Sequence, residues 1–175
     1  MKTKLRALLL AFCALLGGCA SKPIINPVPQ VDLNRFMGDW YVIACIPTMI
    51  ETEAYNAVES YKLDVDGSIA TTFTFNKGAL DGDVKTYHPR GFVTPNTGNA
   101  VWGMQFIWPI KAQYKIAYLA DDYSRTVIAR DARDYVWIMA RTATISDAEY
   151  SELVGLIDKF GYDIAKLRKI PHQLR

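Results

Sequence analysis

The chain has 175 residues, 50% hydrophobic and 22% charged, which is enough apolar material for one compact domain with its own core. Eleven Gly and eight Pro exclude a collagen-like or low-complexity chain, while four Trp, ten Tyr and seven Phe favour strands over an Ala- and Leu-rich helical bundle. The formal charge is +2, but three basic residues lie in the first six positions; without them 17 Lys and Arg face 18 Asp and Glu, so nothing favours binding to nucleic acid.

Residues 1–18 have the pattern of a secretory signal peptide. A basic start is followed by an apolar stretch at residues 7–16, which is too short for a bilayer that needs roughly 20 residues. The run Leu16-Gly17-Gly18-Cys19 then resembles the bacterial lipobox, in which the Cys thiol receives diacylglycerol and the signal is cut just before it. We therefore predict that Cys19 is the lipidated first residue; the alternative is an ordinary signal cut near Ala20.

Residues 19–31 contain three prolines and few charges, and we expect an extended linker that joins the lipidated Cys19 to a domain at residues 32–175. Acyl chains contribute about 0.8 kcal/mol per buried CH₂, so several chains at one Cys make a firm membrane anchor. The residue after Cys19 is Ala20 rather than Asp, which resembles the sorting signal of the bacterial cell outer membrane. The expected location is that membrane, with the domain facing the periplasm.

The cysteines agree with this reading. Cys13 leaves with the signal and Cys19 carries lipid, so Cys45 remains alone and no intrachain disulfide is expected.

Eight strand-like segments follow along the chain. They are rich in aromatic and β-branched residues, and Asp66-Gly67, Asp81-Gly82 and the turn at residues 95–98 separate neighbours. The predicted strands span residues 39–47, 54–64, 68–77, 83–94, 99–109, 113–120, 123–131 and 134–141. Because most links are short, and only residues 48–53 form a longer loop, the pattern predicts an antiparallel up-and-down meander.

After residue 145 the hydrophobic period changes from two to 3.6. Ser146 and Glu149 form a capping-box pattern, and Gly161 is a stop signal. The apolar face between them consists of Tyr150, Leu153, Leu156, Ile157 and Phe160. We expect one amphipathic helix outside the strands, followed at residues 162–170 by an extended tail with a short ninth strand.

The alternation within the strands favours a closed barrel. At residues 102–108 and 135–141 one face carries aromatic and Met side chains and the other carries aliphatic or small ones, so neither face is clearly solvent-like. Eight closed strands leave room inside for side chains or one small ligand. The predicted fold is all-β, an eight-stranded antiparallel up-and-down β-barrel with one C-terminal α-helix packed outside.

Three short motifs resemble those of the lipocalin family. Gly38-Asp39-Trp40-Tyr41 matches the Gly-x-Trp-Tyr signature of the first lipocalin strand, and Asp121-Asp122-Tyr123 is similar to Thr-Asp-Tyr before the seventh strand, with Asp in place of Thr. Arg141 matches the lone Arg that ends the eighth strand. The resemblance covers residues 33–170, and within the family it is nearest to the bacterial outer-membrane lipoprotein lipocalins.

The motif residues have a structural reading. Gly38 permits a tight entry into the barrel, Trp40 plugs its closed end, and Arg141 stacks on the indole as a cation–π contact worth about 0.5–2 kcal/mol. Asp122 and Tyr123 belong to a turn, in which Asp can cap as an Asx turn. We expect these five residues to close the barrel rather than to bind a ligand.

Strand parity and the family resemblance together predict the pocket. An inward Trp40 sends Val42 and Ala44 inward and Cys45 outward, unless a bulge reverses the parity. The predicted ligand-binding residues are Val42, Ala44, Phe73, Phe75, Trp102, Met104, Phe106, Tyr114, Ile116, Tyr118, Tyr135, Trp137 and Met139. Such a surface suits an aliphatic chain, with Tyr hydroxyls near the mouth to hold a polar end.

The sequence offers little for catalysis. The two His and three Cys have no metal-ligand spacing, no nucleophile elbow or phosphate loop is present, and no catalytic residue, metal or cofactor is predicted. Glu51, Glu53 and Glu59 are interpreted as a solvated rim. Cys45 is the remaining candidate nucleophile, since one lipocalin uses a pocket Cys to isomerise a prostanoid, but its outward parity argues against that role.

The resemblance implies a carrier that holds a fatty acid, a lysophospholipid or a similar amphiphile in its barrel, next to the membrane to which Cys19 anchors it. The alternative is a structural or interaction lipoprotein whose barrel is filled by its own aromatics. Apolar outer faces leave a homodimer open.

Overall fold

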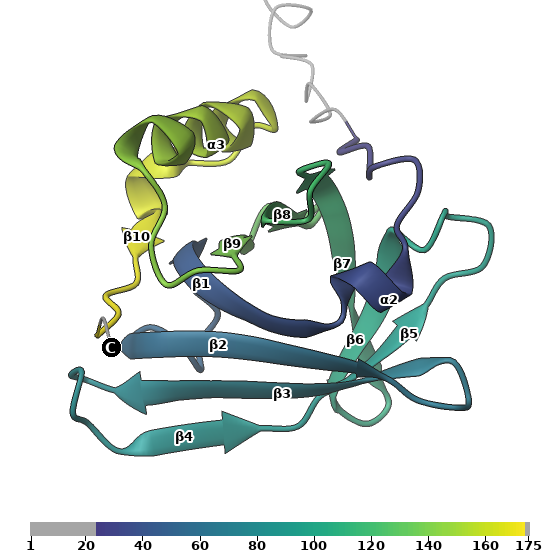
Figure 1. The fold of residues 1–175 in the computed structure, drawn as a ribbon, viewed down its shortest axis with the longest axis horizontal. Helices are drawn as coiled ribbons and strands as arrows, with labels where there is room; N and C mark the ends of the chain where they lie inside the picture. Colours follow the sequence, from purple (N-terminus) through teal and green to yellow (C-terminus); the bar gives the residue numbers. More distant parts are fainter. Residues whose placement is uncertain (1–23, 174–175) are drawn as a thin grey trace, which may run out of the picture.

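The computed structural model describes residues 24–173, so the predicted signal peptide and Cys19 lie outside the described residues (Figure 1). The helical elements are α2 (Leu33–Phe36), α3 (Asp147–Lys159) and the 3₁₀ turn η2 (Ile164–Lys166). The strands are β1 (Gly38–Ile46), β2 (Ala54–Leu63), β3 (Ser68–Lys77), β4 (Val84–Tyr87), β5 (Arg90–Val93), β6 (Val101–Ile107), β7 (Ile110–Leu119), β8 (Arg125–Ala129), β9 (Val136–Ala140) and β10 (Arg168–Lys169).

The strands close into an antiparallel barrel, which confirms the predicted fold. Neighbours pair in chain order, and β1 pairs with both β2 and β9. The predicted strand at residues 83–94 is split into β4 and β5, which both pair with β3. Pro89 lies in the gap, where a residue without an N–H cannot continue the ladder. Counting β4 and β5 as one broken strand, and leaving out the two-residue β10, gives eight barrel strands.

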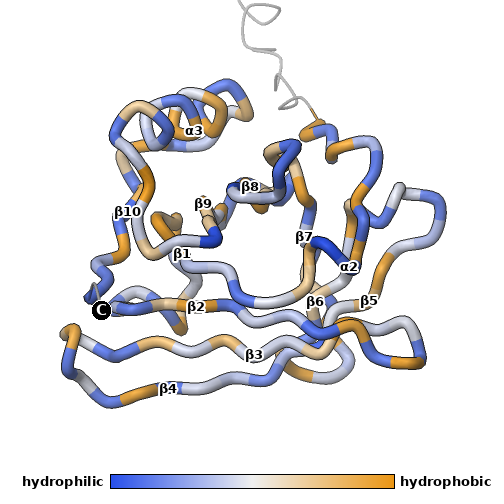
Figure 2. The backbone as a smooth tube through the Cα atoms, in the orientation of Figure 1, coloured by the Kyte–Doolittle hydropathy of each residue, from blue (hydrophilic) through white to orange (hydrophobic). Residues whose placement is uncertain are grey.

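Burial alternates along β2 and β3, and Figure 2 shows hydrophilic and hydrophobic residues following one another along both strands. Ile69, Phe73 and Phe75 of β3 lie in the interior core cluster. On β9 the outward residues Val136, Ile138 and Ala140 instead lie in a second cluster, together with Leu153 and Ile157 of α3. The apolar outer faces of β1, β8 and β9 are therefore covered by α3, which lies outside the barrel (Figure 1).

The helix begins and ends where the sequence predicts. Ser146 and Glu149 form the reciprocal capping box, and Leu153 and Ile157 are buried on the apolar face. Gly161 follows with φ +81°, a left-handed conformation that glycine adopts without strain. The predicted extended tail contains η2 and then β10, whose two residues pair with Ala44 and Cys45 of β1.

The closed end of the barrel is built by the motif residues, in agreement with their predicted structural role. The guanidinium of Arg141 lies 3.9 Å from the Trp40 ring centroid, and it donates hydrogen bonds to the carbonyl oxygens of Arg35, Phe36, Met37 and Asp39. The Trp40 indole N–H donates to the carbonyl of Phe36 at 2.8 Å. One cation thus ties α2, the start of β1 and the end of β9 together.

The remaining motif residues shape turns at the same end. Gly38 has φ +91°, with the Arg141 guanidinium 3.5 Å from where a Cβ would lie. Asp122 accepts the N–H of Ser124, which is the predicted Asx turn. Tyr123 accepts the N–H of Asp32 through its hydroxyl and lies under the Arg35 guanidinium.

The N-terminal segment, residues 24–31, is the part of the predicted extended linker that the structure describes, and it packs against the barrel. It contains no helix or strand, but Ile25 is buried beneath α3 and Val31 lies in the interior cluster. Backbone bonds join Val28 to Ile116 and Val31 to Gly98. The segment packs against the barrel because the apolar side chains of Ile25 and Val31 are buried there.

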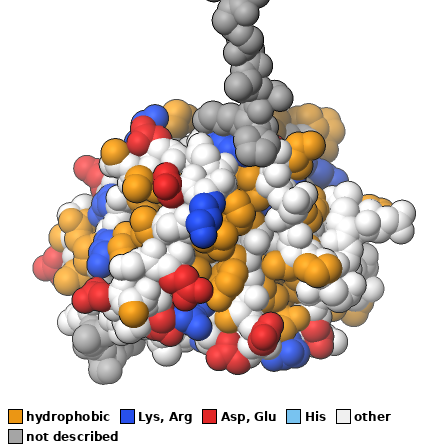
Figure 3. Space-filling view, turned by 90° about the horizontal axis from the view of Figure 1, so that it is seen from above, with side chains coloured by type: hydrophobic (Ala, Val, Ile, Leu, Met, Phe, Trp, Pro, Cys, Tyr) orange, Lys and Arg blue, Asp and Glu red, His pale blue; other side chains and the backbone are white. Residues whose placement is uncertain are grey.

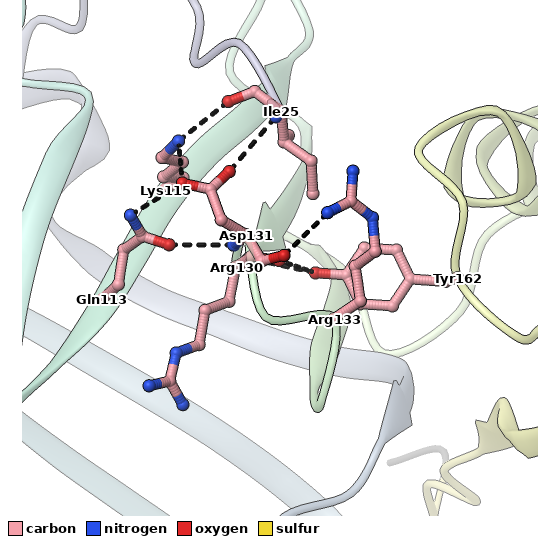
Figure 4. A network of polar contacts seen from close by, with 7 residues as sticks. All are labelled: Ile25, Gln113, Lys115, Arg130, Asp131, Arg133 and Tyr162. Carbon is pink, nitrogen blue, oxygen red and sulfur yellow. Dashed lines mark hydrogen bonds and ion pairs between the residues drawn. The ribbon is translucent and has the colours of Figure 1, made fainter. Parts of the chain in front are cut away.

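A polar network fixes the start of this segment (Figure 4). The Lys115 ammonium donates to the Ile25 carbonyl at 3.0 Å and to Asp131 at 2.6 Å, and the Ile25 N–H donates to the same Asp131. Gln113 completes the network by bonding Asp131 through its amide. Asp131 lies in the β8–β9 loop, so the segment begins beside that loop and runs toward α2 at the closed end.

Among residues 24–173, no helix is both long and apolar enough to cross a bilayer.

Candidate ligand-binding cavity

The barrel contains a cavity of about 530 Å³ at the end opposite Trp40. Its mouth lies between the β1–β2 loop, the β6–β7 hairpin and the β8–β9 loop. The lining residues are Pro47, Thr48, Met49, Ile50, Glu51, Glu59, Phe73, Tyr87, Met104, Phe106, Ile107, Ala112, Gln113, Tyr114, Asp134, Tyr135 and Trp137. The barrel is therefore not filled by its own aromatic side chains.

Eleven of the thirteen predicted ligand-binding residues lie inside the barrel or at its mouth. Six of them line the cavity: Phe73, Met104, Phe106, Tyr114, Tyr135 and Trp137. Val42, Trp102, Ile116 and Met139 belong to the interior cluster without lining the cavity. Phe75 lines a neighbouring cavity of about 300 Å³ under the β3–β4 hairpin. That any of them contacts a ligand stays a prediction.

The inward directions predicted for Ala44 and Tyr118 are wrong. Ala44 belongs to the outer cluster beside α3, and Tyr118 packs against that cluster. The pairing register shifts between Val42 and Ala44 on β1, and between Ile116 and Tyr118 on β7. A β-bulge adds one residue to one strand, so every side chain beyond it changes face.

The bulge on β1 also corrects the direction predicted for Cys45, which points into the barrel and is 1% exposed. Burial raises the pKa of the Cys45 thiol well above its ordinary range, and the nearby Glu51 raises it further. The thiol also does not line the cavity. Neither property favours a thiolate nucleophile, because the reactive form is the anion.

Two carboxyl groups interpreted as a solvated rim are buried instead. Glu51 is 2% exposed and Glu59 is 6% exposed, while Glu53 is exposed as expected. The burial of Glu59 could have been predicted from strand parity, because Glu59 lies two residues from the buried Ala57 and Tyr61 on the same face of β2. Nothing local indicates the burial of Glu51, which depends on how its loop folds over the barrel.

Glu51 fastens the β1–β2 loop to β9. One of its carboxylate oxygens accepts the backbone N–H of Thr48 at 2.9 Å, and both lie within 3.2 Å of the Trp137 indole nitrogen. Burial raises the pKa of the Glu51 carboxyl, against the lowering effect of these hydrogen bonds. The loop is thereby held at one side of the cavity mouth.

Glu59 belongs to a hydrogen-bonded group at the inner end of the cavity, which we call the acid–phenol floor: Glu59, Tyr61 and Tyr114. The Tyr61 hydroxyl donates to one Glu59 oxygen, and the Tyr61 and Tyr114 hydroxyls are 2.8 Å apart. Trp102 stacks on Tyr114 with ring centroids 5.0 Å apart. Burial raises the pKa of the Glu59 carboxyl to about 7, although the Tyr61 hydrogen bond lowers it.

Figure 3 shows how charged side chains are distributed over one face of the molecule. On the face seen in Figure 3, acidic and basic side chains lie intermixed among hydrophobic ones. Among residues 24–173, no three His, Cys, Asp or Glu side chains are grouped as metal ligands.

Comparison with known proteins places the chain in a family. A family model described as a lipocalin-like domain matches residues 31–172. Temperature-induced lipocalin-1 of Arabidopsis thaliana is 30% identical over 164 residues, 86% of this chain and 84% of that protein. The outer membrane lipoprotein Blc of Vibrio cholerae is 24% identical over 97% of this chain and 100% of its own, and that of Escherichia coli K12 is 27% identical over 81% and 80%.

Solved structures show the same fold. Insecticyanin from the tobacco hornworm Manduca sexta superposes with a TM-score of 0.68 at 16% identity, covering 86% of each chain. Apocrustacyanin C2 superposes with a TM-score of 0.64 at 13% identity, covering 81% of this chain and 80% of its own.

Proposed function

The chain belongs to the lipocalin family, and from this premise we propose that it reversibly binds a fatty acid, a lysophospholipid or a similar amphiphile in its barrel. The observation that carries the proposal is the cavity of about 530 Å³, which is apolar over most of its lining. Its volume lies within the range of about 300–1,000 Å³ that is usual for small-molecule sites.

The expected affinity follows from tail burial. An acyl tail of about 16 carbons yields at most roughly 12 kcal/mol at 0.8 kcal/mol per CH₂, before the costs of association and ordering are subtracted. Dissociation constants between micromolar and nanomolar are consistent with what remains.

We further propose that Cys19 anchors the protein by lipid to the bacterial outer membrane, facing the periplasm, after removal of residues 1–18. Two relatives are named outer membrane lipoproteins, which supports this location. The N-terminal segment adds a geometric argument, because six residues from Cys19 to Ile25 span at most about 20 Å. Ile25 is held beside the β8–β9 loop, at the mouth end of the barrel. Self-association as a homodimer stays a prediction.

An apolar rim at the mouth supports loading from a membrane. Met49, Ile107, Trp108 and Ile110 are each at least 68% exposed, and Met49 and Ile107 also line the cavity. A cluster of exposed apolar side chains marks an interaction site. Because the tether begins at the same end, we propose that the rim contacts the phospholipid surface and that lipid passes from there into the cavity.

A large side chain placed in the cavity should weaken binding. Ala112 lines the cavity opposite Met104 on β6, so Ala112→Trp places an indole in the ligand volume. We expect the affinity for a fluorescent acyl probe to fall by at least about tenfold, because the indole takes up part of the volume that the acyl tail would occupy. Every contact described here lies within residues 24–173, so the titration uses a chain beginning at Ala20. Ala148→Trp, on the exposed first turn of α3, is the matched control. Equal affinity in both variants would contradict the proposal.

Removing the rim should slow loading without weakening binding. In the double variant Trp108→Ser and Ile110→Ser, whose parent residues are exposed and do not line the cavity, we expect probe transfer from phosphatidylethanolamine–phosphatidylglycerol vesicles to slow by about tenfold, because each lost apolar contact is worth over 1 kcal/mol. The affinity for probe in solution should stay unchanged. Val65→Ser, equally exposed but at the closed end, is the control. An unchanged transfer rate would exclude the rim as the contact with the membrane.

A further inference from the structure

The charged groups that line the cavity are all acidic. Glu51, Glu59 and Asp134 carry carboxyl groups, and no Lys, Arg or His stands among the described lining residues. An amphiphile with a carboxylate or phosphate head would therefore find no cation to pair with inside. The acidic residues therefore bear on which head group is bound, whereas the apolar lining bears on the tail.

Glu59 is the deepest of the three. It lies opposite Trp40 in the β1–β2 register, at the level of the indole that plugs the closed end. It is 6% exposed, and its Oε2 accepts the Tyr61 hydroxyl. Its Oε1 accepts no hydrogen bond from any described residue, although Glu59 lines the cavity. One oxygen of a buried carboxyl is thus available to a bound molecule.

A buried acceptor of this kind discriminates between head groups. A hydroxyl or ammonium donor satisfies it, whereas an apolar tail end leaves it without a partner and a second anion repels it. Sites with a buried polar group reject molecules that cannot complete the hydrogen bond more strongly than apolar pockets reject a wrong size.

We propose that the acid–phenol floor is a head-group subsite, which binds a single-chain amphiphile with its polar end inward and selects a hydroxyl or ammonium group over a carboxylate or phosphate. This inference rests on the proposed function and narrows its ligand class, because it favours similar amphiphiles with a hydroxyl or ammonium end over fatty acids and lysophospholipids. The tail then extends along Phe73 and Met104 toward the mouth.

The selectivity should depend on pH through Glu59. Its neighbours across the strands, Trp40 and Phe73, carry no charge. The other ionisable groups around the cavity are Glu51, Asp134, Tyr61, Tyr87, Tyr114 and Tyr135. Because burial raises the pKa of Glu59 to about 7, its carboxyl is mostly ionised at pH 8 and mostly protonated at pH 5.5. The preference for an ammonium head should therefore be largest at the higher pH.

Three ligands with the same tail test the subsite: hexadecylamine, hexadecanol and hexadecanoic acid, each displacing a neutral fluorescent probe from residues 20–175. At pH 8 we expect the amine and the alcohol to bind at least about tenfold more tightly than the acid, the size of effect that one buried hydrogen bond to a charged group produces. In Glu59→Gln the amine should lose most of this preference. Glu152→Gln, on the exposed face of α3, should keep it.

The unchanged chain supplies a second measurement that needs no variant, because the preference for amine over acid should shrink between pH 8 and pH 5.5. Equal binding of the three ligands, or a preference that Glu59→Gln leaves intact, would overturn the subsite while leaving the carrier function standing. Failure of all three ligands and of the probe to bind would overturn both.

Discussion

Replacing Trp40 with alanine is expected to lower the free energy of unfolding by about 3–5 kcal/mol, the usual cost of removing a large aromatic side chain from a core. Trp40 is fully buried, its ring centroid lies 4.9 Å from that of Phe36, and its indole donates to the Phe36 carbonyl. The substitution also removes the surface on which the Arg141 guanidinium stacks. The short helix α2 and the end of β9 would then lose the indole that both of them contact.

Equilibrium denaturation followed by circular dichroism measures this loss. Trp108→Ala is the matched control, because Trp108 is 82% exposed and its removal should change stability by no more than about 0.5 kcal/mol. Similar losses in the two variants would show that the plug does not hold the closed end.

Glu59→Gln is expected to stabilise the protein at high pH and to leave it nearly unchanged at low pH. Burial raises the pKa of Glu59 from 4.5 to about 7, so the folded state holds a proton that the unfolded state releases. Stability from this group is complete below pH 4.5 and is lost as the pH rises to about 7. At 1.36 kcal/mol per pKa unit the loss amounts to about 3 kcal/mol, which a neutral Gln of the same shape avoids.

The measurement is denaturant unfolding of parent and variant at several values between pH 4.5 and pH 8. The difference in unfolding free energy should grow with pH, and Glu152→Gln should show no such growth. Burial also raises the pKa of Glu51, which is present in both proteins. The variant should therefore still show part of the decline in unfolding free energy that the parent shows as the pH rises. A difference that is constant over this range would mean that Glu59 titrates normally and is not desolvated.

The strands and the helix were predictable because their signals are local. Asp66-Gly67 marks a hairpin on its own, and Ser146 with Glu149 marks a helix start without reference to distant residues. The closed end was predictable from three motifs. Arg141 joins the first and the third, which lie about a hundred positions apart, and Tyr123 of the second contacts Asp32 and Arg35.

The errors in the predicted inward and outward directions of side chains have one physical origin. Ala44, Cys45 and Tyr118 were misdirected because each follows a bulge, and one extra residue reverses every later side chain on its strand. No composition signal marks these bulges, since the residues around them are ordinary strand formers.

The polar part of the cavity was missed for a different reason. Charged residues are usually exposed, so Glu51 and Glu59 were interpreted as solvated. Their burial depends on partners distant in the chain: Trp137 for Glu51, and Tyr114 in addition to Tyr61 for the acid–phenol floor. The prolines of the N-terminal segment predict an extended chain, but they carry no information on the packing of Ile25 under α3.

Native mass spectrometry of residues 20–175, purified without detergent and followed by lipid extraction, tests the carrier function most directly. We predict a mass adduct of one amphiphile per chain, which delipidation removes and a hexadecyl ligand restores at one-to-one stoichiometry. The same adduct should be reduced in Ala112→Trp and unchanged in Ala148→Trp. A chain that carries no lipid and takes up none after delipidation would contradict the central claim that the barrel is a binding site.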